Sequence, residues 1–368
     1  MQRNEVNTMS IAMQNRYKKL RAKMAELGLD AIYVNSPENH LYMCGFDNPD
    51  GCLFITKETT YVFADFRYIE AAKAEADPEF CTVCLPGQPK ISEVVGEMGI
   101  RVIGYEDESL TCSEFERFRD ALKEHSAEYV PMGGTFTGIR AFKSEEEVEY
   151  ITAAQRIAEA AFEHILKTIT YDMTEIEVAA ELEYFMKKHG SDKPSFDTVC
   201  VSGTASARPH GVPRPVKLEK GFLTMDYGAM VKGYHSDMTR TVVIGKADAE
   251  EKRLYNTVLE AQLAALDAIT EGVRNADMDK VARDIIDNAG YAGCFGHGLG
   301  HGVGLMIHES PNLSFRSGDA VLAAGQLITV EPGIYLEGKY GCRIEDMVFI
   351  TPGGKRNLTE CPKELIEL

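Results

Sequence analysis

The sequence is short of basic charge and of long apolar runs. Its 39 Lys and Arg residues stand against 57 Asp and Glu residues, a net charge of −18 that would repel a phosphate backbone. No stretch approaches the roughly 20 apolar residues of a membrane span, and the first residues lack the apolar core of a signal peptide. The sequence therefore predicts a cytoplasmic protein that binds neither nucleic acid nor a membrane.

A dense cysteine framework is also absent. Nine cysteines, an odd number, are scattered along the chain without the spacing of a secreted disulfide scaffold, which indicates a reducing compartment. Cys81 and Cys84 form a C-x-x-C pair, but no second pair accompanies them. A zinc site or a redox motif is therefore disfavoured, and we expect both cysteines to be structural.

Local patterns divide the chain into two domains. Its 368 residues match about two domains of ordinary size. Short apolar runs that alternate with helical stretches predict an α/β domain first, and segment 131–140, which contains one Pro and three Gly, is expected to be a linker. We therefore predict domains at 1–135 and 136–368. Apolar residues at helical spacing predict a first helix that Gly28 ends: Met13, Tyr17, Leu20, Met24 and Leu27.

The sequence pattern of the second domain indicates two similar halves. Capping-box pairs at Ser144/Glu147 and Thr174/Glu177 predict two helix starts, with the second helix ending before Gly190. An offset of about 103 residues between Val178-Ala179 and Val281-Ala282 predicts an internal pseudo-duplication. The expected class is α+β, with strand-rich runs at 196–203, 222–245 and 327–350 and further helices near 249–271 and 277–290.

Each half supplies two carboxylates on either side of a turn. Asp226 and Asp237 flank the turn signal 230–233, so a hairpin would bring them nearly opposite each other. Glu331 and Glu345 flank a segment rich in glycine in the same way. Most strand acids are simply solvated, but Asp226 and Glu331 follow strongly apolar runs, where a charge is costly unless it is paired or bound to metal. Four converging carboxylates would repel one another unless two divalent ions balanced their charge.

Histidine supplies a further type of ligand in the same region. Five of the nine histidines fall between residues 210 and 308. The segment 295–304 contains too many glycines for a helix, so His297 and His301 are not a helical zinc pair, and no H-E-x-x-H motif occurs. A zincin protease is therefore excluded on pattern. Glycine-rich phosphate-loop motifs are missing as well.

Together these motifs resemble the pita-bread metallopeptidases, and among them aminopeptidase P and prolidase, the Xaa-Pro peptidases. The resemblance extends from near Ser144 to the C-terminus, and the first 130 residues resemble the creatinase-type α/β domain that precedes this catalytic domain. The implied fold is an α/β creatinase-like domain followed by an α+β pita-bread domain. The matching segments are Pro209-His210-Gly211, 225–228, 236–240, 300–304, His308-Glu309, 330–333 and 343–346.

The resemblance implies a site for two divalent metal ions. Asp237 and Glu345 would bridge the two ions, Asp226 would complete one of them, and His301 with Glu331 would complete the other. An oxygen-rich set with one imidazole suits Mn(II), which we expect, with Co(II), Fe(II) and Zn(II) as alternatives.

Other residues receive catalytic or supporting roles. By resemblance, Glu331 would shuttle a proton, His210 and His308 would contact the substrate amide and stabilise the tetrahedral intermediate, and His297 would line the pocket near proline. Spacing along the strands predicts that Arg343 orients Glu345 and that Thr239 orients Asp237. His235 is expected to be structural.

The resemblance implies hydrolysis of the bond between an N-terminal residue and proline. The expected substrates are peptides with proline at the second position, and the expected assembly is a homodimer. The sequence does not separate an Xaa-Pro aminopeptidase from an Xaa-Pro dipeptidase. Rival readings are a metal-free amidinohydrolase of the creatinase type and a non-catalytic binding scaffold. A methionyl aminopeptidase has similar chemistry, but its usual form lacks the N-terminal domain.

Overall fold

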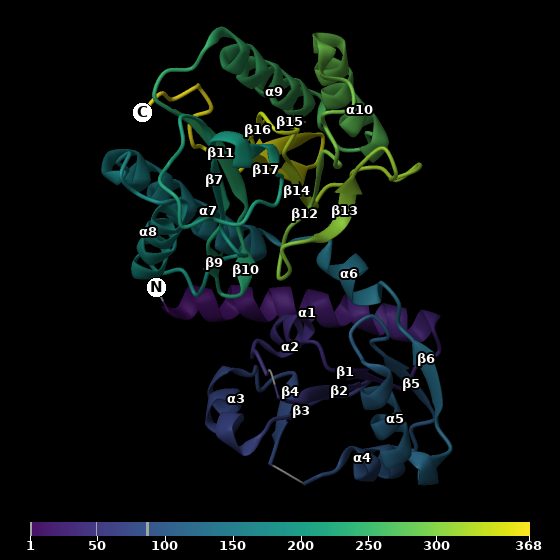
Figure 1. Cartoon of the computed structure of the whole chain (residues 1–368). Coiled ribbons are helices and arrows are strands. Elements are labelled where there is room, and N and C mark those ends of the chain that lie inside the picture. Colours follow the sequence, from purple (N-terminus) through teal and green to yellow (C-terminus); the bar gives the residue numbers. More distant parts are fainter. Residues whose placement is uncertain (1, 49, 86–87) are drawn as a thin grey trace. The chain divides into compact units, whose positions relative to one another are not determined.

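The computed structural model describes residues 2–48, 50–85 and 88–368, and contacts divide the chain into units 1–140 and 141–368 (Figure 1). The first unit contains a mixed six-stranded sheet in the order β4-β3-β2-β1-β5-β6. Strand β1 pairs antiparallel with β2 and parallel with β5, as in an α/β layer. The strands are β1 (Ala31–Val34), β2 (Cys52–Thr56), β3 (Thr60–Phe63), β4 (Cys81–Cys84), β5 (Val102–Tyr105) and β6 (Glu128–Pro131).

Helices cover both faces of this sheet. Phe118 and Val95 of two helices pack with Phe54 on one face, and the Tyr17 hydroxyl lies 2.6 Å from Oγ1 of Thr60 on the other. The helices are α1 (Gln2–Glu26), α2 (Pro37–Cys44), α3 (Ile69–Glu75), α4 (Ile91–Met98), α5 (Cys112–Ala121) and α6 (Thr135–Arg140), with 3-10 turns η1 (Phe66–Tyr68) and η2 (Lys123–His125).

The predicted first helix is confirmed and ends two residues before Gly28, but two details expected of this unit were wrong. The apolar stripe of α1 is buried from Met13 to Met24, but Leu27 lies beyond the end of the helix and is 37% exposed. Segment 131–140 is not an open linker, because it contains the end of β6 and the whole of α6. That helix is only six residues long, too short to produce a readable helical period in the sequence.

Both predicted capping boxes are present in the second unit. Ser144 and Thr174 each accept a hydrogen bond from the backbone N–H of the glutamate three residues later, and that glutamate accepts one from the N-cap backbone in return. These contacts satisfy amide groups that the first turn of a helix leaves free. The helices are α7 (Glu145–Thr168), α8 (Glu175–Lys188), α9 (Ala249–Ala268) and α10 (Asn275–Ile286), followed by a π turn η4 (Asp287–Tyr291).

The strands of the second unit form several small antiparallel sheets. A three-stranded sheet has the order β11-β8-β7, and a five-stranded sheet has the order β13-β12-β14-β17-β18. Two hairpins, β9-β10 and β15-β16, extend from them. The first half contains β7 (Val199–Ser202), turn η3 (Gly203–Ala207), β8 (Gly221–Tyr227), β9 (Met230–Val231), β10 (Tyr234–His235) and β11 (Met238–Ile244). The second contains β12 (Gly300–Gly302), β13 (Glu309–Leu313), β14 (Leu327–Val330), β15 (Gly333–Leu336), β16 (Tyr340–Arg343), β17 (Asp346–Thr351) and β18 (Gly354–Asn357).

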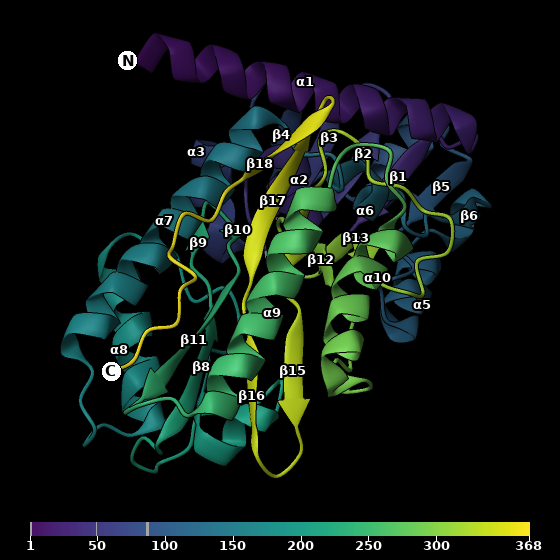
Figure 2. The same ribbon diagram turned by 90° about the horizontal axis from the view of Figure 1, so that it is seen from above.

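Each half of this unit buries its own pair of helices against its own strands. Phe162 of α7 and Leu182 of α8 share a core with Met225 of β8. Val258 of α9 shares a second core with Ile328 of β14, and Figure 2 shows α9 alongside β15 and β16. This arrangement agrees with the predicted helix and strand order, whereas the internal duplication itself stays a prediction.

Candidate metal centre

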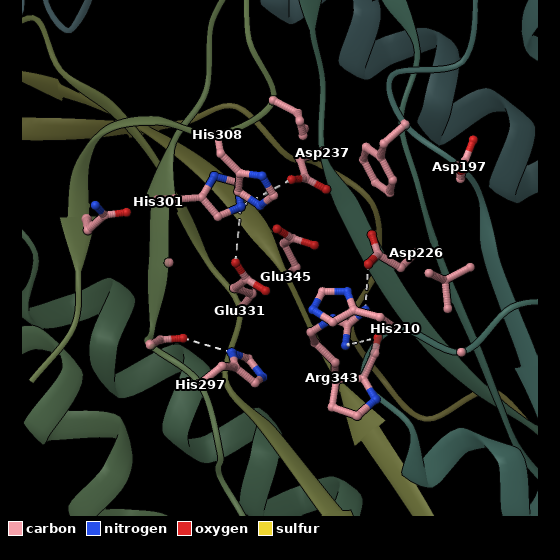
Figure 3. A pocket seen from close by; sticks show the side chains of 18 of the residues that line it. Asp197, His210, Asp226, Asp237, His297, His301, His308, Glu331, Arg343 and Glu345 are labelled. Carbon is pink, nitrogen blue, oxygen red and sulfur yellow. Dashed lines mark hydrogen bonds and ion pairs between the residues drawn. The ribbon is translucent and has the colours of Figure 1, made fainter. Parts of the chain in front are cut away.

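Asp226 and Asp237 meet at the end of a hairpin. In the β8-β11 pair Asp226 lies opposite Thr239, and Asp237 directly precedes β11. Gly228 makes the close approach between them feasible, because a side chain there would run into the backbone carbonyl of Ser236. The two carboxylates consequently face one cavity, as the sequence predicted for a hairpin (Figure 3).

Glu331 and Glu345 lie where two sheets part. Val330 pairs with Asp346 in the β14-β17 pair, and Gly333 pairs with Arg343 in the β15-β16 pair. The two glutamates occupy the gap between these pairings, outside both ladders. Their side chains are thereby free to point into the same cavity as the aspartates (Figure 3).

His301 on β12 completes the cluster. Its Nδ1 lies 3.0 Å from the carbonyl oxygen of Gly302, which fixes the proton on that nitrogen and leaves Nε2 with a lone pair. Nε2 lies 3.3 Å from Oε1 of Glu331 and 3.6 Å from Oδ2 of Asp237. One ligand atom each from Asp237, His301 and Glu345 lie within 4.8 Å of one another, a spacing compatible with a shared cation.

The electrostatics of the cluster favour a bound cation. Burial, together with the neighbouring carboxylates, raises the pKa of Asp237 and of Glu345 well above the ordinary range. Burial also raises the pKa of Glu331 to about 7 and lowers the pKa of His301. Negative charge is therefore costly here in the metal-free chain, and divalent cations would remove that cost.

Two buried oxygen atoms give a direct test of whether metal ions fit. Oδ1 of Asp226 and Oε1 of Glu345 are buried and have no hydrogen-bond partner among the described residues. A buried carboxylate oxygen without a partner is unfavourable unless something binds it. Both atoms belong to residues predicted as ligands, and carboxylates with one imidazole suit Mn(II) or Fe(II). The residues present thus fit a metal centre.

Arg343 and Thr239 hydrogen-bond to other carboxylates than the sequence predicted. Arg343 does not bind Glu345; its Nη2 donates to Oδ2 of Asp226 at 2.5 Å. Thr239 does not bind Asp237; its hydroxyl donates to Oε2 of Glu345 at 2.7 Å. Arg343 also donates from Nε to Oγ1 of Thr239, 2.9 Å away, which joins the two contacts. Each half of the unit therefore holds a carboxylate of the other half.

The carboxylates border a cavity of about 950 Å³. His301 and His308 lie on one side of them with ring centroids 4.2 Å apart, and His210 lies on the other side near Arg343 (Figure 3). His210 and His308 are both exposed to the cavity. Each can therefore reach a peptide bound there.

The remaining histidines have protein partners. Nε2 of His297 lies 3.0 Å from the Tyr335 hydroxyl, and burial lowers the pKa of His297 to about 4. His235 is buried with its Nδ1 2.9 Å from Oγ of Ser195. Only His297 of these two lines the cavity.

Two families match the sequence. The creatinase/prolidase N-terminal domain matches residues 16–142, and metallopeptidase family M24 matches residues 149–352. The chain belongs to metallopeptidase family M24. The predicted pita-bread fold and creatinase-type first domain are thereby confirmed, and M24 membership implies the use of divalent metal ions.

Similar proteins narrow the class further. The Xaa-Pro dipeptidase of Pyrococcus furiosus is 37% identical, with 96% of this chain and 100% of the relative covered. The structure of an Xaa-Pro dipeptidase from Bacillus anthracis is 41% identical with a TM-score of 0.90, covering 97% of this chain and 100% of that one. An X-Pro aminopeptidase from Thermotoga maritima is 36% identical with a TM-score of 0.88, covering 94% and 100%. This M24 chain is therefore a peptidase, a hydrolase as predicted.

Two residues that hydrogen-bond to the predicted site residues were not themselves predicted from the sequence. The Thr329 hydroxyl donates to Oε1 of Glu331 at 3.1 Å and accepts from the backbone of His301. The sequence could have indicated the role of Thr329, because Thr329 lies two residues before Glu331 on an apolar strand. The Tyr335 hydroxyl accepts a hydrogen bond from Nη1 of Arg343 at 2.7 Å. No local pattern in the sequence predicts this contact.

The described residues of the first unit, 2–48, 50–85 and 88–140, contain no comparable cluster. Among residues 2–48, 50–85 and 88–368, the one group of three or more His, Cys, Asp or Glu side chains that could hold a metal is Asp237, His301 and Glu345. Burial raises the pKa of the Cys81 thiol to about 12 and that of Cys84 to about 11, as expected of inert buried thiols. In the same ranges, no helix is long and apolar enough to cross a bilayer.

Proposed function

We propose that this M24 peptidase is an Xaa-Pro aminopeptidase, which hydrolyses the bond between an N-terminal residue and a following proline with two divalent ions. Asp226, Asp237, His301, Glu331 and Glu345 would hold the ions. The observation that carries the proposal is the pair of buried carboxylate oxygens without partners, on Asp226 and Glu345, beside a cavity lined by His210 and His308. Mn(II) is the ion we expect.

The chemistry divides between the ions and the chain. When bound, the ions would lower the pKa of a water molecule and polarise the scissile carbonyl. Glu331 would take up the proton of the attacking water and deliver it to the proline nitrogen, because its carboxylate borders the cavity beside His301. His210 and His308 would donate to the carbonyl oxygen as negative charge develops there.

The remaining cavity residues would position these groups. Arg343 restrains Asp226, and Thr239 restrains Glu345, so neither carboxylate has to be ordered when the ions bind. His297, restrained by Tyr335, would line the wall near the substrate proline. Proline at the second position is supported by the names of the similar proteins, which are Xaa-Pro dipeptidases and an X-Pro aminopeptidase.

Substrate length distinguishes the two candidate activities, because a dipeptidase accepts only Xaa-Pro and an aminopeptidase also accepts longer peptides. A cavity of about 950 Å³ is near the upper limit for a small-molecule site, so its size is compatible with the peptides of more than two residues that an aminopeptidase would bind. The alternative, an Xaa-Pro dipeptidase, is favoured by the names of the Pyrococcus furiosus and Bacillus anthracis proteins.

One set of substrates separates these possibilities. The chain, loaded with Mn(II), is given Ala-Pro, a longer peptide that begins Ala-Pro, and Ala-Ala at equal concentrations. We expect cleavage of both proline peptides and little cleavage of Ala-Ala. Equal turnover of Ala-Ala would overturn the proline preference, and cleavage of Ala-Pro alone would replace the aminopeptidase by the dipeptidase.

A further inference from the structure

A buried ion pair lies directly beside the catalytic histidine His308. Nζ of Lys143 is 3.0 Å from Oε2 of Glu309, and the two side chains are 1% and 0% exposed. Burying both charges is costly, and an apolar pair of similar volume would often be no less stable. A pair of this kind is better explained by the geometry that it fixes than by stability alone.

Glu309 folds back under the turn that carries His308. Its Oε1 accepts a hydrogen bond from the backbone N–H of Met306 at 3.1 Å. A side chain at Gly304 would collide with the carboxylate of Glu309, so the turn closes tightly over it. The carboxylate of Glu309 thus bonds the middle of segment 304–309 at Met306 and packs against its beginning at Gly304.

Lys143 provides a rigid base for this contact. Its backbone N–H donates to the carbonyl of Gly325 at 2.7 Å, and Phe142 forms a bridge with Gln326. The next residue, Ser144, caps α7. The ammonium group therefore extends from a backbone that is fixed between this bridge, which lies just before β14, and the start of α7.

The ring of His308 has no such restraint of its own. It is exposed to the cavity and contacts the ring of His301, but no hydrogen bond joins it to another residue in the described part of the chain. Its orientation consequently depends on the backbone of segment 304–309.

We infer that Lys143 and Glu309 are positioning residues for His308: the buried pair fixes the 304–309 turn so that the imidazole faces the scissile amide. The inference rests on the proposed function. It adds two residues, separated from each other by 166 positions, to the machinery of the M24 site.

A double-mutant cycle tests this coupling. With Mn(II) bound, Glu309→Gln should lower kcat on an Ala-Pro peptide by about 10- to 100-fold with little change in KM. In the His308→Ala background the same change should lower kcat no further, because the residue acts through the imidazole. If Glu309→Gln lowers kcat by the same factor in the His308→Ala background as in the wild-type chain, the inference is overturned.

Control variants keep the test clear if Glu309→Gln folds poorly. Glu309→Asp retains the buried charge but shortens its arm, so it should fold, lower kcat less, and show the same non-additivity. Glu175 forms a matched ion pair with Arg214 at 2.6 Å, with its own side chain fully buried. The factor by which Glu175→Gln changes kcat should be the same in the wild-type chain and in the His308→Ala background. A factor that differs between the two backgrounds would mean that the cycle reports general destabilisation.

Hydrogen exchange of the metal-free chain gives a readout that does not depend on activity. Glu309→Gln should speed amide exchange in segment 304–310 and leave α9 unchanged, whereas a uniform increase or none would overturn the inference. If the wild-type chain cleaves no proline peptide while the local exchange effect is present, the proposed function fails and the anchoring of the turn stands.

Discussion

Two buried carboxylates in different units of the molecule have opposite surroundings. In the first unit, Glu106 accepts hydrogen bonds from the backbone of Asn35 and Ser36 and from the side chains of Ser36 and Asn39. In the second, Glu345 accepts one from Thr239, and its other oxygen has no partner in the described chain. Burial alone therefore does not distinguish a structural acid such as Glu106 from a proposed metal ligand such as Glu345.

The difference lies in how far protein donors satisfy each carboxylate. Glu106 uses both oxygens to join the segment after β1 to the segment after β5, so it has no capacity left for a cation. Glu345 and Asp226 each keep one buried oxygen open and lie near further acids. Open, converging carboxylate oxygens therefore favour a bound cation, whereas fully hydrogen-bonded ones do not.

Removing a carboxylate of the metal centre should have the largest effect. Asp237→Ala or Glu345→Ala should abolish metal-dependent cleavage, because each is proposed to bridge both ions. Turnover and bound metal are measured on the same preparation. A variant that keeps full activity would remove its residue from the bridging position.

The next largest effect is expected from a residue that touches a ligand. Thr239→Val removes the hydroxyl that donates to Glu345, and should weaken Mn(II) binding by about 10- to 100-fold. Thr241→Val is the matched control, since Thr241 is buried on the same strand and donates to the carbonyl of Arg343 rather than to a ligand. Equal losses in the two variants would show that any buried hydroxyl on β11 matters.

The stability of the metal-free chain should fall as pH rises above 7. Because the pKa values of Asp237 and Glu345 are raised, the folded chain binds more protons than the unfolded chain. Buried histidines with lowered pKa values, such as His297, act in the opposite sense only below about 6.5. Between pH 7 and 8.5 the loss is at most about 2 kcal/mol for each acid that stays protonated.

Thermal unfolding with a chelator, compared with saturating Mn(II), checks this pH dependence. The metal binds the deprotonated carboxylates, so the fall in stability should disappear when the ions are present. Asp237→Asn should flatten the curve of the metal-free chain. A stability that rises from pH 7 to 8.5 without metal would contradict the raised pKa values.

The smallest effect on the metal centre should come from the first unit. Glu106→Gln leaves buried donors without their charged acceptor, which costs about 1–3 kcal/mol of unfolding free energy. Metal content and kcat should stay at the wild-type values once folded protein is selected. Loss of metal from folded Glu106→Gln would erase the contrast between the two carboxylates.

Local patterns in the sequence predicted what local contacts decide. The capping boxes at Ser144 and Thr174 fixed two helix starts, because the contacts of a cap span only three residues. The turn between Asp226 and Asp237 identified the hairpin for the same reason. Helix α6 was missed because its six residues follow Pro131 and two glycines and carry little periodicity.

Contacts between distant residues could not be read in this way. Strand parity put Arg343 on the face of the metal centre, but its long side chain reaches Asp226, 117 positions away, rather than Glu345. Thr239 likewise donates to a carboxylate 106 positions away. Such pairings depend on how β11 packs beside β16, which no periodicity in the sequence specifies.

Elemental analysis of the active peptidase tests the central claim most directly. The chain is saturated with Mn(II), freed of loose ions, and assayed for metal and for cleavage of an Ala-Pro peptide in the same sample. We predict two ions per chain and loss of both cleavage and bound metal in Glu345→Ala. Full cleavage by a chain that holds no divalent metal would contradict the claim.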